Sequence, residues 1–178
     1  MAKHSLTPKL EKFVLKWGER ATHWGLNRTE AQIHALLFIS EKPLNAQQIS
    51  EALSVARSNV SNSLKELQRW GLIRVVHALG DRRDHFESLK DVWEIFRRAV
   101  SEQKRREIDP VVSLLQETVS DLKDSGEDAA YARENLARMQ VFFEIMGSWY
   151  DDMRPVPTPV IKNFLKLGAK AVHLLGKK

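Results

Sequence analysis

The sequence predicts a mainly α-helical fold with one small β-hairpin, on three observations. Most of the 178 residues follow helical periodicity, with apolar positions three or four apart. Residues 72–89 break this pattern, because two runs of strand-forming residues flank a turn that contains Gly80 and Asp81. Two short helices are predicted directly before the hairpin, at residues 45–53 and 57–70. This order is that of a winged helix-turn-helix, here followed by long helices.

The N-terminal part of the chain predicts two helices. Thr7 followed by Pro8 is typical of a helix start, and apolar residues then recur at helical spacing over residues 8–24. Gly18 is expected to weaken this helix, and Gly25 to end it. A second helix is predicted from Thr29, because Thr29 and Gln32 have the spacing of a capping box. Pro43 breaks the chain after it.

The middle of the chain carries the helix-turn-helix and the hairpin. The helix at 45–53 is followed by a turn at 54–56, and the helix at 57–70 ends at Gly71. Strands are predicted at 72–78 and 83–89, joined by a turn at 79–82. We expect His77 and His85 to face each other across this hairpin.

The remaining residues predict long helices. A helix is expected from Ser88, which has capping-box spacing to Asp91, and Pro110 either kinks it or begins a new helix. Residues 124–126 interrupt the pattern before a helix at 127–150. The proline-rich residues 154–159 predict a stiff, extended linker, and residues 161–175 predict an amphipathic helix.

The helix at 57–70 has two different faces. Val60, Leu64 and Leu67 form an apolar stripe that would hold the helix on the protein core. The other face carries cations and short hydrogen-bonding groups, the types that read base edges and bind phosphates. These candidate DNA-binding residues are Arg57, Ser58, Asn59, Ser61, Asn62 and Lys65. An ordinary amphipathic surface helix is the alternative interpretation.

The hairpin places two adjacent arginines at its tip. Arg82 and Arg83 are of the type that enters a narrow minor groove, where the negative potential is concentrated. Asp81 is expected to support this wing through an ion pair with Arg83 that leaves Arg82 free, or the reverse. A solvated turn is the alternative. The succession of helix, turn, helix and basic hairpin favours DNA binding.

The charge distribution agrees with a localised DNA-binding surface. The net charge of +5 is unevenly spread, because residues 54–90 carry seven basic and four acidic side chains. Residues 91–159 carry nine basic and fourteen acidic side chains, and residues 160–178 carry five basic side chains and no acidic one. A chain that held nucleic acid along its whole length would not contain the acidic block.

Other classes of function are disfavoured by what the sequence lacks. Without cysteine there are no disulfides, thiol nucleophiles or cysteine-based zinc sites, and the six histidines form no His-x-x-x-His pair. No glycine-rich phosphate loop or nucleophile elbow is present, so we expect neither an enzyme nor a cofactor. There is no signal peptide and no run of about 18 apolar residues, which predicts a soluble, cytoplasmic protein without stable membrane insertion.

Residues 29–90 resemble the winged helix-turn-helix of the MarR-type transcriptional regulators. The shared features are Ile49 and Leu53, the run Ser58-Asn59-Val60-Ser61, and the Asp81-Arg82-Arg83 wing. The run 55–64 and the long helical tail are more similar to the GbsR-like branch, which is linked to glycine betaine and choline. Ala56 departs from the family, which usually has a serine N-cap there. The loss of such a cap typically costs about 1 kcal/mol, and Ser58 or a DNA phosphate is expected to compensate.

The resemblance implies a homodimer that represses osmoprotectant uptake or synthesis genes by binding a pseudo-palindromic operator in double-stranded DNA. It divides the chain into a dimerisation helix at 1–28, the DNA-binding domain at 29–90 and a helical dimerisation region at 91–178. The linker at 154–159 and a C-terminal amphipathic arm belong to this last region. The basic face of the arm also allows contact with an anionic membrane, although a dimer arm with solvated lysines is the preferred interpretation.

Five tryptophans raise the question of an effector site. GbsR-like proteins suggest a quaternary ammonium ligand held in an aromatic cage, for which the candidates are Trp93, Trp149 and Tyr150, with Phe86 as a further one. Trp17 and Trp24 lie seven residues apart on one apolar face, as in a core or an interface. A salt-responsive regulator without a ligand, and a helical protein-interaction module that has lost DNA binding, are the alternatives.

Overall fold

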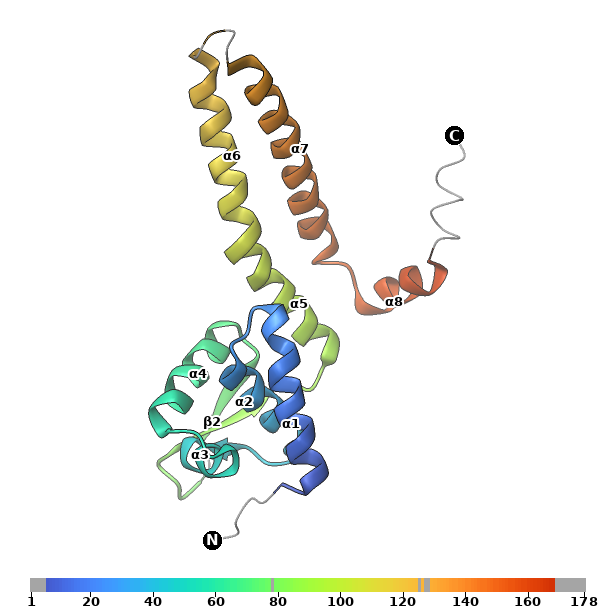
Figure 1. Cartoon of the computed structure of the whole chain (residues 1–178). Helices are drawn as coiled ribbons and strands as arrows, with labels where there is room; N and C mark the ends of the chain where they lie inside the picture. Colours follow the sequence, from blue (N-terminus) through green and yellow to red (C-terminus); the bar gives the residue numbers. More distant parts are fainter. Residues whose placement is uncertain (1–5, 78, 125, 127–128, 169–178) are drawn as a thin grey trace. The chain divides into compact units, whose positions relative to one another are not determined.

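The computed structural model describes residues 6–77, 79–124, 126 and 129–168 (Figure 1). The chain forms two compact units, Met1–Gln103 and Lys104–Lys178. Among the described residues, no helix has the length and apolar character needed to cross a membrane.

The first unit is helical with a small antiparallel sheet, which confirms the predicted fold class. Helix α1 is followed by the short 3-10 helix η1, and α2 precedes the first strand. The helix-turn-helix pair α3 and α4 follows, then the hairpin β2–β3 and helix α5. The elements are α1 Pro8–Arg20, η1 Ala21–Trp24, α2 Arg28–Ile39, β1 Leu44–Asn45, α3 Ala46–Leu53, α4 Arg57–Arg69, β2 Ile73–His77, β3 Asp84–Ser88 and α5 Val92–Gln103.

The sheet has the order β1-β3-β2, so β3 lies in its centre. The short strand β1, which the sequence did not predict, pairs Leu44 with Phe86. The expectation that His77 and His85 face each other is wrong, because the register places His77 opposite Asp84 and His85 opposite Val76. Pairing His77 with His85 would require a connection one residue longer than the one between His77 and Asp84, so the expected pairing is shifted by one position.

Helix α2 forms the centre of the core. Ile33, Leu36 and Leu37 are at most 1% exposed, and residues on nearly all sides of the helix are buried. It contacts α1, α4 and β3, so the helix-turn-helix and the wing rest on one support.

Helix α2 begins with a different capping box from the one predicted. The side chain of Asn27 accepts a hydrogen bond from the Glu30 amide at 2.9 Å, and Glu30 Oε2 accepts one from the Asn27 amide at 3.0 Å. The pair Thr29–Gln32 lies within the helix instead. Both pairs have the required spacing, but Asn27 comes first and Asn is as good an N-cap as Thr.

Gly18 allows α1 and α2 to approach closely. A Cβ at this position would lie 2.4 Å from Gln32 Cγ and 3.2 Å from the Arg28 carbonyl oxygen. The glycine that the sequence indicated as a weak point of the helix is therefore a packing position. It joins α1 to the same compact unit as the helix-turn-helix.

A buried histidine links α2 to the wing strand β3. His34 is 6% exposed, and its Nε2 lies 3.1 Å from Ser88 Oγ. The Ser88 hydroxyl donates to the Leu89 carbonyl at 2.9 Å, so it accepts from a protonated Nε2. Burial, together with the smaller effect of the nearby Lys90 ammonium, lowers the pKa of His34 to about 4.

This histidine predicts a pH dependence of stability. The unfolded chain binds a proton at His34 below about pH 6.5, whereas the folded chain does so only near pH 4, so stability falls as the pH drops through this window. We expect the free energy of unfolding to fall by on the order of 2 kcal/mol between pH 7 and pH 5. Urea unfolding of the wild type and of His34→Gln, which cannot take up this proton, measures the effect. Equal losses in both proteins over that range would contradict it.

Helix α5 begins after Asp91. Asp91 Oδ1 accepts hydrogen bonds from the amides of Trp93 and Glu94 at 2.8 and 3.2 Å. The predicted start at Ser88 is wrong, because Ser88 is the last residue of β3 and is buried against His34.

The second unit consists of helices, and α6 and α7 lie side by side (Figure 1). A π-helical turn, η2, precedes α6, so Pro110 lies in the first turn of a new helix. The side chain of Gln116 on α6 donates to Glu144 on α7 at 2.9 Å. The elements are η2 Lys104–Ile108, α6 Asp109–Asp121, η3 Leu122–Asp124, α7 Ala130–Met153 and α8 Thr158–Leu167.

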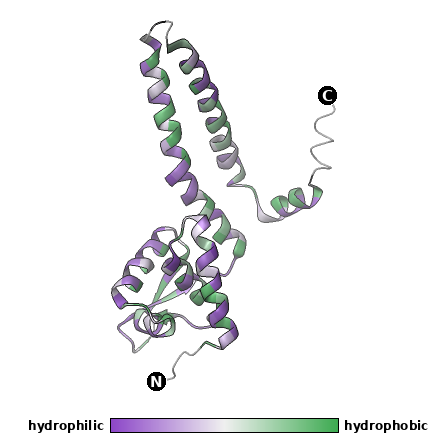
Figure 2. Cartoon of the chain, in the orientation of Figure 1, coloured by the Kyte–Doolittle hydropathy of each residue, from purple (hydrophilic) through white to green (hydrophobic). Residues whose placement is uncertain are grey.

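The extended linker predicted at 154–159 is wrong. Helix α7 continues to Met153, and the Val156 amide donates to the Met153 carbonyl in a turn. Thr158 begins α8 with Pro159 in its first turn, where the missing amide hydrogen costs nothing. Helix α8 carries both hydrophobic and hydrophilic residues and is amphipathic, as predicted for the arm (Figure 2). Residues 169–178 of the predicted arm lie outside the described residues.

Candidate nucleic-acid interface

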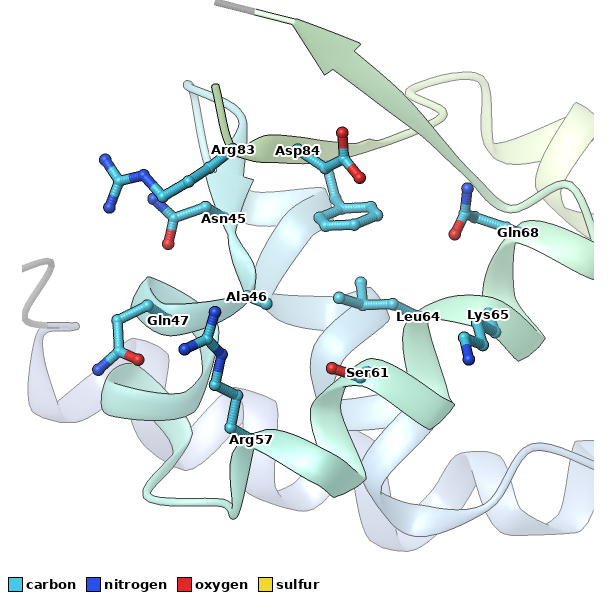
Figure 3. A pocket seen from close by; sticks show the side chains of 11 residues that line it. Asn45, Ala46, Gln47, Arg57, Ser61, Leu64, Lys65, Gln68, Arg83 and Asp84 are labelled. Atoms are coloured by element: carbon cyan, nitrogen blue, oxygen red, sulfur yellow. The ribbon is translucent and has the colours of Figure 1, made fainter. Parts of the chain in front are cut away.

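A groove of about 340 Å³ lies between the start of α3, the exposed face of α4 and the strand β3 (Figure 3). It brings together four of the predicted DNA-binding residues, of which three come from α4 and one from the wing. These residues are Arg57, Ser61, Lys65 and Arg83. Three cationic side chains from two separate elements therefore face one surface.

Local hydrogen bonds set the angle between the two helices of the motif. Asn45 and Gln48 form a capping box at the start of α3, with hydrogen bonds of 2.9 and 3.0 Å. Ser54 then adopts a left-handed conformation with φ of 53°, which reverses the chain. The Ser50 hydroxyl donates to the Val55 carbonyl at 2.7 Å, and the Val55 amide donates to the Ser50 carbonyl at 3.2 Å. The turn is thus fixed from both sides.

Helix α4 has the two faces that the sequence predicted. Val60, Leu64 and Leu67 are at most 2% exposed and pack into the core. On the other face Ser61 is half-buried, whereas the remaining predicted residues are exposed. The exposed residues are Arg57, Ser58, Asn59, Asn62 and Lys65.

Helix α4 begins at Arg57, as predicted, although Ala56 provides no side-chain cap. The first intrahelical hydrogen bond runs from the Val60 amide to the Ala56 carbonyl at 3.1 Å. Ser58 caps no amide in the described part of the chain, so the expected compensation by this residue is absent. The first-turn amides are left open beside the exposed Arg57 side chain.

At the wing, Asp81 binds Arg83. Asp81 Oδ1 accepts hydrogen bonds from the Arg83 amide at 3.0 Å and from Arg83 Nε at 2.9 Å, and the second carboxylate oxygen contacts the same guanidinium. The guanidinium lowers the pKa of the Asp81 carboxyl well below its usual range, and the carboxylate raises the pKa of Arg83. Of the two ion pairs that the sequence allowed, the structure forms Asp81–Arg83.

Arg82 lies free at the tip of the wing. Its side chain is exposed and makes no hydrogen bond or ion pair with another described residue. Gly80, with φ of +84°, provides the turn before it. The two wing arginines are therefore different: Arg83 is oriented by Asp81 along the groove, and Arg82 is available to a ligand.

The groove also contains polar residues that the sequence analysis missed. Gln47 on α3 and Gln68 on α4 line it, and both carry amide groups that can bind bases or phosphates. Little in the sequence indicates that these two residues belong to the site, since a glutamine on an exposed helix face is common. Asp84 also lines the groove and is the acidic residue opposite these donors.

The residues suggested for an aromatic cage belong to different parts of the chain. Trp93 is half-buried on α5 in the first unit, whereas Trp149 and Tyr150 lie on α7 in the second. Trp149 is 56% exposed and lines a shallow pocket with Glu144 and Asp152. Phe86 lies on β3 in the first unit, where it packs in the core and borders the groove beside α4.

Two further tryptophans pack against each other. The rings of Trp17 and Trp24 meet edge to face with centroids 5.5 Å apart, and Trp24, on η1, is 59% exposed rather than part of the core. The described residues contain no group of three or more side chains suited to hold a metal ion.

Comparison with known proteins gives a family match for the segment that carries most of the groove. Residues 24–84 match the model of the MarR family. The chain is similar to a solved structure described as a transcriptional regulator, with 19% identity, a TM-score of 0.65, and coverage of 83% of this chain and 96% of that one. MepR, a transcription regulator of the Staphylococcus aureus multidrug efflux pump MepA, aligns at 19% identity and a TM-score of 0.38 over 74% of this chain and 87% of its own. No curated protein matches the chain.

Proposed function

We propose that this chain, in which residues 24–84 match the model of the MarR family, is a DNA-binding transcriptional regulator that acts as a homodimeric repressor. The observation that supports the proposal most is the groove in which Arg57, Lys65 and Arg83 converge beside the unpaired Arg82. Helix α4 would enter the major groove with Asn59 and Asn62 toward the bases, and the wing would reach the minor groove. Such a regulator would act in the cytoplasm, where the chromosome is.

The polar residues of the site have distinct roles in this proposal. Arg57 and Lys65 would bind phosphates at the two ends of the exposed face of α4, which fixes the register of the helix on the duplex. Ser58 and Ser61 would add hydrogen bonds to the backbone or to base edges. Asp81 would act on DNA only through Arg83, because its carboxylate is occupied by that guanidinium.

The proposed partner of the chain is a second copy of itself. Large apolar side chains are exposed on α1, α7 and α8, which is costly unless another surface covers them. We propose that they form the dimer interface, with the helix at 1–28 and the region 91–178 contributing most of it. The exposed residues include Leu10, Phe13, Val141, Phe142, Ile145, Trp149, Phe164 and Leu165.

Deletion of residues 160–178 tests the dimer. The variant loses most of α8 with its exposed Phe164 and Leu165, so we expect a weaker dimer and, because two linked half-sites no longer bind together, a lower affinity for a palindromic site. Sedimentation over a range of protein concentrations measures the change. A matched control replaces Lys162 and Lys166 with Gln, which alters the charge but keeps the apolar face. A truncated chain that stays dimeric would refute the role of the arm.

We further propose that the regulated genes serve osmoprotectant uptake or synthesis, with glycine betaine or choline as effector. The support within the chain is the exposed Trp149 beside Glu144 and Asp152, since an aromatic ring and carboxylates suit a quaternary ammonium group. Tyr150, the next residue on α7, is the other candidate in this unit. DNA affinity measured with each compound at constant ionic strength, and then over a salt series without it, separates a ligand-gated repressor from a salt-responsive one.

A further inference from the structure

The C-terminal end of α4 is bound by a side chain of α5. Helix α4 ends in a Schellman turn, in which the Leu72 amide donates to the Leu67 carbonyl at 2.9 Å and the Gly71 amide to the Gln68 carbonyl at 2.8 Å. The carbonyl of Gly71 then accepts a hydrogen bond of 2.6 Å from Arg98 Nη1. Arg98 Nε donates at the same time to Glu94 Oε1 at 2.8 Å.

Gly71 provides the space for this contact. Its φ of +67° is strained for other residues, and a Cβ there would lie 2.3 Å from Arg98 Nη1. The guanidinium therefore rests directly on the backbone of the turn. Because two of the three guanidinium nitrogens of Arg98 have partners, one on α5 and one at the end of α4, the side chain is held between the two helices.

A second contact lies one turn further along α5. Glu102 is 9% exposed, and its Oε1 lies 3.8 Å from Arg69 Nη2. Arg69 is the last residue of α4 and also binds Glu66 at 2.6 Å. Arg98 and Glu102 are four residues apart, so both reach the end of α4 from the same face of α5.

Apolar contacts alone would not fix this arrangement. Ile95 and Ala99 pack against the core and hold α5 in place, but hydrophobic contact has no preferred direction. The bond from Arg98 to Gly71 is directional, so it favours one rotation of α5 relative to α4. Helix α5 ends at Gln103, where the first unit ends, so it is the covalent connection from the DNA-binding unit to the second one.

We propose that Arg98 is a positioning residue that fixes α4 against α5 and thereby determines which half-site spacing the regulator accepts. The inference rests on the proposed function, since it requires a dimer that reads two half-sites. In such a dimer the two recognition helices lie about 34 Å apart, one turn of DNA. A rigid contact between α4 and α5 keeps the two recognition helices of the dimer at one distance. A flexible contact lets each α4 adjust to half-sites that lie slightly closer together or farther apart.

The test uses the full-length chain and DNA duplexes selected by the wild type from a random pool. Derivative duplexes carry one base pair more or fewer between the half-sites. We expect the wild type to lose about 10-fold or more in affinity on these duplexes, and Arg98→Met to lose only about 2- to 3-fold relative to its own best site. The slope of affinity against salt should stay unchanged, because Arg98 does not line the groove.

Two variants control for loss of packing. Glu94→Gln weakens the ion pair on α5 but leaves the bond from Arg98 to Gly71, so it should keep the spacing preference of the wild type. Arg98→Lys retains a cation for the carbonyl and should restore part of the preference. A spacing profile of Arg98→Met equal to that of the wild type, or an equal loss on every duplex, would overturn the role of Arg98. A wild type that selects no sequence would instead refute the proposed function itself.

Discussion

The double substitution Arg82→Ala, Arg83→Ala is expected to weaken operator binding by about 100-fold or more while the protein stays folded and dimeric. Arg82 is exposed and pairs with no other residue that the structure describes, and Arg83 lines the groove, so neither supports the core. Loss of a charged contact to DNA typically costs about 1–3 kcal/mol, and the wing loses two. Fluorescence anisotropy with a labelled duplex measures the affinity.

The salt dependence of this variant distinguishes the site from a general effect of charge. Each lost phosphate contact should lower the slope of log affinity against log salt by about 0.9. The control Lys42→Ala removes a positive charge from an exposed position outside the groove and outside the proposed dimer interface. We expect the control to bind almost as the wild type does. Equal affinity and slope in the wing variant and the wild type would refute the assignment of the wing.

The second large effect concerns sequence preference. In Asn59→Ala, Asn62→Ala, the exposed face of α4 loses two amides that can each bind a base through two hydrogen bonds. We expect the ratio of specific to non-specific affinity to fall by about 10- to 100-fold, since a base contact is worth about 1–3 kcal/mol of discrimination. Competition between the selected duplex and a scrambled one measures this ratio.

Lys65→Ala is the comparison for this experiment. Lys65 lies on the same face and lines the groove, but a flexible cation suits a phosphate more than a base. Its removal should weaken binding to both duplexes by similar factors and leave their ratio unchanged. A double-asparagine variant that behaves like Lys65→Ala would show that Asn59 and Asn62 do not read bases.

The sequence predicted the parts of the fold that depend on local pattern. The two faces of α4 and its start at Arg57 follow from the spacing of Val60, Leu64 and Leu67, and the structure has both. The ion pair between Asp81 and Arg83 was one of two local options, because neighbouring residues in a turn can pair in few ways. Such features need no knowledge of distant residues.

Features that depend on distant residues were missed. The strand β1 forms only because Leu44 meets Phe86, about forty residues later in the chain. Gly18 is unfavourable by helix propensity alone, and its role depends on the close contact with Gln32 on another helix. The role of Arg98 likewise depends on its contact with Gly71. The three prolines of residues 154–159 predict an extended linker, but Pro159 lies in the first turn of α8, where proline is also favourable.

The central claim is that this chain reads two related half-sites in double-stranded DNA with α4 and the wing. Hydroxyl-radical footprinting of the full-length protein on a duplex selected from a random pool tests it most directly. We expect two protected segments related by two-fold symmetry, about 10 base pairs from centre to centre, with flanking minor-groove protection that Arg82→Ala, Arg83→Ala removes. Failure to select any sequence, or protection without two-fold symmetry that the wing variant leaves intact, would contradict the claim.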